Sequence, residues 1–443
     1  MGRGLIQCVR HHRLTSSFCG ACPLGVCYAF SCRLLMKPLH YYLFGTGAWF
    51  LSFGIQNVTF TWLVTMVLQS SPQLVGTAQM TMLIPALLFM LVGGSLADQY
   101  GGRTVIIPAQ LVAAVAPFIL ITVIATDHLS FGVMLLFAAI MGSAQAFVTP
   151  ARDSLLYLVA DGRIQRRVVQ TSLIQFSIQM FGFMIASFAD TIGATVILTV
   201  QSLSLLTGVA AYYLMGSKFS GGYPLPSSSR HNIVKEIVSS ITEGFHTVNG
   251  SGAMRAVVIQ NCAMGLFFMG SYIVTLPILV REMYAGSSSE LSWMNSANAL
   301  GLVISIMFLL RFGDLARQGR ALQLAQGIGS FALAGAGLGL GFNSLVLCVF
   351  AWGLCGGVAM TMSRTIMQEH APLDQRGRMM AFYSFSFMGS GPLGALLCGF
   401  LVEHLGPEYA LLIASASMFA VVVTISARSR LWKLDARELV ISN

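Results

Sequence analysis

The sequence predicts an all-α membrane protein with twelve transmembrane helices in two pseudo-symmetric six-helix bundles. Three observations lead to this prediction. Only 9% of the 443 residues are charged and 56% are hydrophobic, whereas soluble domains carry about 25% charged residues. Twelve apolar runs, each close to the roughly 20 residues that a spanning helix needs, follow one another along the chain. Landmarks in the first half of the chain recur in the second half.

The apolar runs are continuous and do not alternate with polar residues, so they predict helices and exclude a transmembrane β-barrel. Glycine, serine and threonine are frequent within them, as in helices that pack closely in lipid. We place the spans near residues 41–67, 74–97, 104–126, 129–149, 168–190, 192–215, 256–280, 290–310, 321–341, 343–362, 379–402 and 407–426.

The basic residues predict the orientation, because Lys and Arg concentrate in cytoplasmic loops. Twelve spans place both termini on one side. With that side cytoplasmic, Arg281 is the one basic residue of 25 that falls outside. We therefore expect a multi-pass protein of the plasma (bacterial inner) membrane with both termini in the cytoplasm. The net charge of +9 then reflects topology and attraction to anionic lipid, and we expect no nucleic-acid partner.

The cysteines indicate neither a disulfide framework nor a metal site. Four of the nine lie in predicted spans and five in the first 35 residues. The "CGAC" at residues 19–22 has zinc-knuckle spacing, but no second pair of ligands follows at the usual distance. For residues 1–35 we weigh a signal peptide against an unnatural extension ahead of a start at Met36, and we favour the extension.

A Gly/Ser/Pro-rich stretch divides the chain into two sets of six spans. It predicts a bundle over residues 36–215, a cytoplasmic linker over 216–253, a second bundle over 254–426 and a cytoplasmic tail over 427–443. "GSLADQYGGR" after the second span has a counterpart, "GDLARQGR", after the eighth, and the loops after spans four and ten also correspond. Duplicated six-helix halves are typical of secondary transporters, with the substrate site near the midplane.

The turn at residues 94–103, "GSLADQYGGR", resembles the loop 2–3 signature of the major facilitator superfamily, G-x-L-a-D-r-x-G-r-k. Gln99 and Gly102 stand where two basic residues are usual. "TPARDSLL", "LPILVREMYAGSSSE" and "RGRMMAFYSFSFMGSGPLGALLCGFL" are similar to the branch that includes the enterobactin exporter and macrolide and drug efflux proteins. The resemblance covers about residues 36–426 and implies the major facilitator fold and a monomer.

The resemblance also implies a conformational latch at this turn. In the family, Asp98 faces the positive end of helix 11, which begins near Arg378, only when the halves close on the cytoplasmic side. A carboxylate there gains about 0.3–2 kcal/mol, so the latch would favour the outward-facing state; the alternative is a loop anchored at the headgroups. Arg152 and Arg364 are equally well explained as snorkelling arginines. The predicted latch residues are Gly94, Asp98, Gly101, Arg103, Arg152, Arg364 and Arg378.

Uncharged polar residues within the spans are the candidates for a substrate cavity. By family architecture, helices 1, 4, 5, 7, 8, 10 and 11 face that cavity, and they also carry aromatic residues, so we expect an amphipathic or weakly charged organic substrate. Gln175 and Gln179 share one helical face, as do Asn295 and Asn298, although an interhelical hydrogen bond explains any single amide as well. The full set is Asn57, Gln145, Gln175, Gln179, Asn261, Tyr272, Asn295 and Asn298.

The charged residues of the spans lie at their outer ends. Helix 1 carries Gln56 and Asn57 where many drug/proton antiporters have a carboxylate. If protons drive transport, the candidate carriers are Asp190, Glu282 and Glu403.

The sequence contains no motif for catalysis or nucleotide binding. H-E-x-x-H, G-x-S-x-G and G-x-x-x-x-G-K-[ST] are all absent, so we expect no enzyme, no cofactor and no direct use of ATP. The expected function is secondary active transport of a small organic molecule (a drug, siderophore or metabolite) by alternating access, in the direction of export. An uptake carrier or uniporter of the same fold is the alternative, and a non-transporting membrane protein or intramembrane enzyme is a remote one.

Overall fold

The computed structural model describes residues 38–159, 164–216, 247–312, 317–371 and 376–433, and long helices fill these ranges. The predicted arm over residues 1–35 and most of the linker lie outside them. The first helices are α3 (Pro38–Trp62) with its π-helical continuation η1 (Leu63–Val67), α4 (Pro72–Tyr100), α5 (Gly102–Ala125), α6 (Phe131–Val159), α7 (Ile164–Ala186), the short α8 (Ala189–Ile192) and α9 (Ala194–Leu214).

The second set begins with one continuous helix that changes its winding along its length. It consists of α11 (Gly252–Ala263), the π-helical η4 (Met264–Met269) and η5 (Ser271–Thr275), and α12 (Leu276–Tyr284). There follow α13 (Ser288–Phe312), α14 (Gln318–Ala336), α15 (Phe342–His370), α16 (Arg376–Leu405), α17 (Pro407–Arg428) and the 3-10 turn η6 (Arg430–Lys433). In the described ranges these helices match the predicted spans one for one and in order.

The ends of several helices differ from the predicted span ends. α6 continues to Val159 and α15 to His370, well past the ends of their apolar runs near 149 and 362. Hydropathy marks the part of a helix that lies in lipid, and a helix continues beyond that depth wherever its backbone bonds are satisfied. Ten described helices are long and apolar enough to cross a membrane; α7 and α14 fall short because glutamine and arginine interrupt them.

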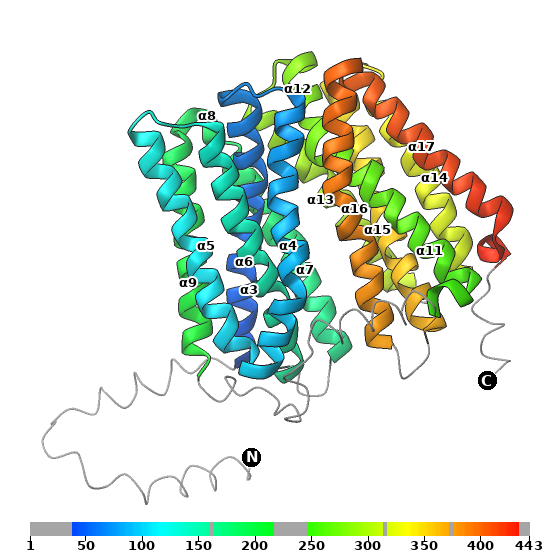
Figure 1. The fold of residues 1–443 in the computed structure, drawn as a ribbon, viewed down its shortest axis with the longest axis horizontal. Coiled ribbons are helices and arrows are strands. Elements are labelled where there is room, and N and C mark those ends of the chain that lie inside the picture. The colour runs from blue at the N-terminus through cyan, green and yellow to red at the C-terminus, as the bar shows by residue number, and fades with distance from the viewer. Residues whose placement is uncertain (1–37, 160–163, 217–246, 313–316, 372–375, 434–443) are drawn as a thin grey trace, which may run out of the picture.

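The helices form two bundles that lie side by side (Figure 1). We call α3 to α9 the N-terminal bundle and α11 to α17 the C-terminal bundle. The apical end is the end at which α12 ends and α13 begins, and the basal end is the end at which α4 ends and α5 begins. The predicted fold, an all-α protein of two six-helix bundles, is confirmed by this arrangement.

Glycines set the spacing between helices. Within the N-terminal bundle, a Cβ at Gly142 would lie 2.0 Å from the Met82 carbonyl oxygen, so α6 approaches α4 as closely as only glycine permits. Between the bundles, a Cβ at Gly76 of α4 would lie 2.6 Å from the Ala395 carbonyl oxygen of α16. Gly399 makes a similar approach to Pro72. α4 and α16 therefore touch at the apical end, and they diverge toward the basal end (Figure 1).

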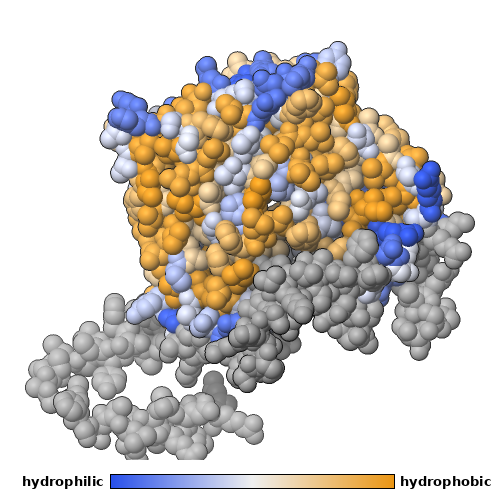
Figure 2. Space-filling view, in the orientation of Figure 1, coloured by the Kyte–Doolittle hydropathy of each residue, from blue (hydrophilic) through white to orange (hydrophobic). Residues whose placement is uncertain are grey.

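The flanks of the molecule are apolar. Figure 2 shows hydrophobic side chains over the sides of both bundles and hydrophilic ones gathered at the apical and basal rims. Leu88, Phe331 and Leu347 are each more than 60% exposed. Such a belt between polar rims is the surface that a bilayer covers.

Candidate functional site

An aromatic and amide cluster joins three helices of the C-terminal bundle. The Tyr272 hydroxyl donates to Asn295 Oδ1, and Asn295 Nδ2 donates to the Leu291 carbonyl oxygen at 2.8 Å. The Trp352 ring packs against both the Tyr272 ring and the Phe268 ring, with centroids 5.9 Å and 5.4 Å apart, respectively. Phe268 and Tyr272 belong to the π-helical part of their helix, and π segments are frequent at functional sites. The predicted Tyr272 and Asn295 are thus brought together.

The predicted amides of the N-terminal bundle have a different setting. Asn57, Gln145, Gln175 and Gln179 are all half-buried. None of their side chains has a hydrogen-bond partner among the residues that the structure describes. An amide that is neither exposed nor paired within the protein is free to bond water or a ligand. These four residues therefore remain candidates for the cavity wall.

Besides Asn295, two predicted amides bond other helices. Asn261 is 3% exposed, and its Nδ2 donates to the Tyr383 carbonyl oxygen and to Ser386 Oγ, both at 2.9 Å. These bonds tie α11 to α16. Asn298 Nδ2 donates to the Val349 carbonyl oxygen of α15 at 3.4 Å. This is the geometry of an interhelical hydrogen bond, the alternative explanation for such residues.

The turn between α4 and α5 is described in its backbone. Gly101 adopts φ 84°, a left-handed conformation that favours glycine, and Gly94 packs beside Pro150 of α6. The side chains of Asp98 and Arg378, the central pair of the predicted latch, lie outside the described residues. Their pairing stays a prediction.

Arg103 caps the end of α9. Its Nε donates to the Tyr212 carbonyl oxygen at 2.9 Å and its Nη2 to that of Tyr213 at 2.8 Å. Its guanidinium also lies 5.7 Å from the centre of the Tyr213 ring. A cation at the C-terminal end of a helix is stabilised by the unpaired carbonyls and the helix dipole, so Arg103 fastens α5 to α9 within its own bundle.

The pseudo-symmetric arginines Arg152 and Arg364 differ in their burial. Arg152 is only 9% exposed; its guanidinium lies 4.8 Å from the Phe50 ring centre and 3.4 Å from Asp153 Oδ1. Arg364 is exposed. The setting of Arg364 fits a snorkelling arginine, whereas Arg152 packs against α3.

The three candidate proton carriers all lie at the apical end. Asp190 Oδ1 accepts from Trp62 Nε1 at 2.9 Å, and the Glu282 carboxylate pairs with Arg281 at 2.8 Å. Glu403 accepts from a backbone N–H of α4. In the described ranges, no group of three or more His, Cys, Asp or Glu side chains is placed to hold a metal ion.

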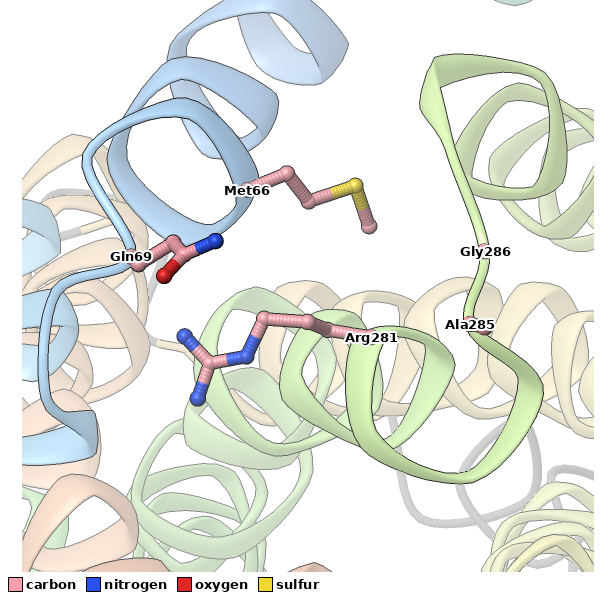
Figure 3. Close-up of a pocket in the computed structure, with 5 residues that line it drawn as sticks. All are labelled: Met66, Gln69, Arg281, Ala285 and Gly286. Carbon is pink, nitrogen blue, oxygen red and sulfur yellow. The ribbon is translucent and has the colours of Figure 1, made fainter.

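A cavity of about 410 Å³ opens at the apical junction of the two bundles. Figure 3 shows the Arg281 side chain extending toward Gln69 across it. In the sequence, Arg281 stands out only as the exception to the distribution of basic residues. Its contacts are with residues distant in the sequence, which no local motif reveals. The lining residues are Met66, Gln69, Arg281, Ala285 and Gly286.

Comparison with known proteins gives consistent results. The model of a family described as transmembrane secretion effector matches residues 45–443. The multidrug efflux pump Tap of Mycolicibacterium fortuitum is 23% identical over 395 residues, which span 86% of this chain and 93% of that protein. The enterobactin exporter EntS of Salmonella choleraesuis (strain SC-B67) is 26% identical over 180 residues, or 39% of this chain and 42% of that protein.

Solved structures share the fold. An auto-inhibited peptide transporter of the POT family has a TM-score of 0.70 at 14% sequence identity, covering 88% of this chain and 96% of that chain. The nucleoside transporter NupG has a TM-score of 0.66 at 14% identity, covering 88% and 99%.

Proposed function

Because the chain belongs to the transmembrane secretion effector family of the major facilitator superfamily, we propose that it is a secondary active transporter that exports a small organic molecule by alternating access. The predicted family, with its likeness to the efflux branch, is confirmed by the family match and by Tap and EntS. Both of these relatives are named as exporters, which supports the outward direction.

The observation that carries the proposal is the one-sided contact between the bundles. α4 and α16 pack glycine against backbone at the apical end and diverge toward the basal end. An alternating-access transporter closes one end of its central path at a time. The structure has the form of one of these two end states.

The basic residues indicate which end faces the cytoplasm. Of the arginine side chains that the structure describes, Arg281 is the one at the apical end. We infer that the basal end is cytoplasmic and that the structure is the inward-facing state. The described arginines at the basal end are Arg103, Arg152, Arg167, Arg255, Arg311, Arg317, Arg320, Arg364 and Arg428.

The residues predicted to line the substrate cavity support an amphipathic substrate. The N-terminal bundle offers half-buried amides that have no partner among the described residues, and the C-terminal bundle offers the Tyr272, Asn295 and Trp352 cluster. Such a wall combines apolar contact with a few polar groups that orient a ligand. It suits an uncharged or weakly charged organic molecule that contains aromatic or apolar surface.

Transport measurements in proteoliposomes test the proposal. Purified protein would be assayed for efflux and uptake of a panel of drugs and siderophores, with and without an imposed pH gradient. We expect at least one compound to move faster than in protein-free liposomes, and a cell that lacks the protein to become more sensitive to it. Lowered sensitivity, or lost growth on a nutrient, would indicate an uptake carrier. Absence of movement for every compound, with cellular sensitivity unchanged, would contradict export.

A further inference from the structure

Two carboxylates at the apical end each cap a helix of the opposite bundle. Asp190 belongs to the N-terminal bundle, and its Oδ2 accepts from the backbone N–H of Ser288, the first residue of α13, at 2.6 Å. Glu403 belongs to the C-terminal bundle, and its Oε2 accepts from the backbone N–H of Gln73, in the first turn of α4, at 3.3 Å. Both carboxylates therefore lie where unpaired N–H groups and the helix dipole favour a negative charge.

Arg281 makes the opposite contact in the same place. It belongs to the C-terminal bundle, and its Nη1 donates to the carbonyl oxygens of Thr65 at 2.9 Å and Ser70 at 3.0 Å. Thr65 lies in η1, and Ser70 lies in the turn that follows. The Thr65 carbonyl lies in the last turn of the first spanning helix of the N-terminal bundle, where the dipole favours a cation, and the Ser70 carbonyl belongs to the turn after it. All three charges thus have the sign that the helix end of the other bundle requires.

The Asp190 contact is reinforced on both sides. Trp62 Nε1 donates to Asp190 Oδ1 at 2.9 Å, which fixes the carboxylate from within its own bundle. The Asp190 backbone N–H donates to Ser288 Oγ at 3.3 Å, and Ser288 Oγ donates to the Ser187 carbonyl oxygen at 3.0 Å. Ser289 Oγ reaches the same carbonyl at 3.2 Å. At this junction each bundle therefore donates hydrogen bonds to the other.

The backbone around Arg281 is strained in both bundles. Gln69 has φ 47° and Ala285 has φ 44°, a left-handed conformation that side chains with a Cβ rarely adopt. Each residue follows the first spanning helix of its bundle, so the two occupy equivalent places in the repeat, and both line the apical cavity (Figure 3). Strained backbone of this kind is concentrated in switch regions.

We propose that Asp190, Glu403 and Arg281 form an apical gate that stabilises the inward-facing state and releases when the transporter turns outward. This inference rests on the proposed alternating access. Each cap joins a charge of one bundle to a helix end of the other, so all three contacts break together when the apical ends separate. The three residues act by setting which end is closed, and they are positioning residues for transport.

The gate can be tested by the reactivity of one cysteine. Ser292 is 2% exposed and lies one turn below Ser288 on the same face of α13, so it is covered while the gate is closed. Ser292→Cys would be introduced into protein whose native cysteines are replaced by serine. Its rate of modification by a membrane-impermeant maleimide, added from the apical side, reports opening.

We expect Arg281→Gln and Asp190→Ala each to raise the modification rate of the reporter about two- to thirtyfold, the range for losing one charged helix cap. Asp190→Asn keeps an acceptor for the Ser288 N–H and should raise the rate less than Asp190→Ala. Glu408→Gln is the matched control, because Glu408 is an exposed carboxylate in the first turn of α17, within its own bundle. It should leave the rate unchanged.

A second reporter separates gating from unfolding. Ser330 lies inside the C-terminal bundle at 2% exposure, with its hydroxyl bonded to the Gln326 carbonyl oxygen. A cysteine introduced by Ser330→Cys should therefore stay unreactive in every variant. Unchanged reactivity of the Ser292 reporter in both Arg281→Gln and Asp190→Ala would overturn the gate, as would an equal rise at the Ser330 reporter. Labelling requires neither substrate nor transport, so failure of the gate and failure of the export assay are separate results.

Discussion

At the scale of single residues, the amides of the spans divide by what they bond. Asn261 uses its side-chain N–H groups on α16, whereas Gln175 and Gln179 have no partner within the described part of the chain. A hydrogen bond already made between helices contributes stability, and an unmade one is available to substrate. The two kinds of amide should therefore respond differently to replacement by leucine.

Replacing Gln175 and Gln179 together by leucine should weaken transport without unfolding the protein. Each lost hydrogen bond to substrate weakens binding by about 0.5–1.5 kcal/mol, so we expect the KM for a polar substrate to rise about fivefold or more. The initial rate of efflux from proteoliposomes as a function of substrate concentration measures this. An unchanged KM for every transported compound would remove these two residues from the cavity wall.

Asn261→Leu should have the reverse effect. It removes the bonds from α11 to α16, and interhelical hydrogen bonds in membranes contribute about 0.6 kcal/mol on average and up to about 1.7. We therefore expect a lower unfolding temperature in detergent with the KM unchanged. A raised KM at unchanged thermal stability would instead place Asn261 in the substrate path.

The sequence identifies the amides within the spans but does not show which of them bond other helices. Asn261 and Gln175 both interrupt an apolar run, and their difference lies in a carbonyl and a hydroxyl of α16 more than 120 positions from Asn261. Arg281 shows the same limit, since its acceptors Thr65 and Ser70 are 216 and 211 positions away. Charge patterning placed it outside, and only the tertiary structure shows what it caps.

At the scale of helices, glycines within a bundle and glycines between bundles have different consequences. Gly142→Ala would drive a Cβ to 2.0 Å from the Met82 carbonyl oxygen inside the N-terminal bundle. Gly76→Ala would drive one to 2.6 Å from the Ala395 carbonyl oxygen across the apical contact of the bundles. The first clash exists in every transport state, and the second only while the apical end is closed.

We therefore predict that Gly142→Ala lowers the thermal stability of the protein, whereas Gly76→Ala raises the reactivity of the Ser292→Cys reporter and leaves the stability nearly unchanged. Thermal unfolding and maleimide labelling of the same two variants measure both effects. A stability loss in Gly76→Ala as large as in Gly142→Ala would contradict the distinction.

Helix order could be predicted from the apolar runs, and helix ends and winding could not. Hydropathy reports burial in lipid, so it gave no sign that α6 continues to Val159. The π-helical turns at Met264–Met269 and Ser271–Thr275 lie inside an unbroken apolar run, where an altered turn leaves no mark on composition. α14 forms a long helix in spite of its glutamines, because a neighbouring helix bonds them: Gln323 of α14 bonds Gln260 of α11 at 3.0 Å.

At the scale of the whole molecule, we propose opposed devices at the two ends of the bundles. The proposed apical gate would stabilise the inward-facing state. The latch predicted at Asp98 would stabilise the outward-facing state through the start of α16. A transporter cycles only if neither state is much more stable than the other, so the two devices should be of comparable strength.

Asp98→Asn and Arg281→Gln should therefore compensate each other. Asp98→Asn alone should shift the population inward and slow transport, and Arg281→Gln alone should shift it outward. Each removes a charge at a helix end, an effect of about 0.3–2 kcal/mol. The two positions lie at opposite ends of the molecule, so their free energies should add. The double variant should then label at the Ser292 reporter within about twofold of the parent protein and transport faster than either single variant. A double variant that labels as fast as Arg281→Gln alone would show that the carboxylate at position 98 holds no latch.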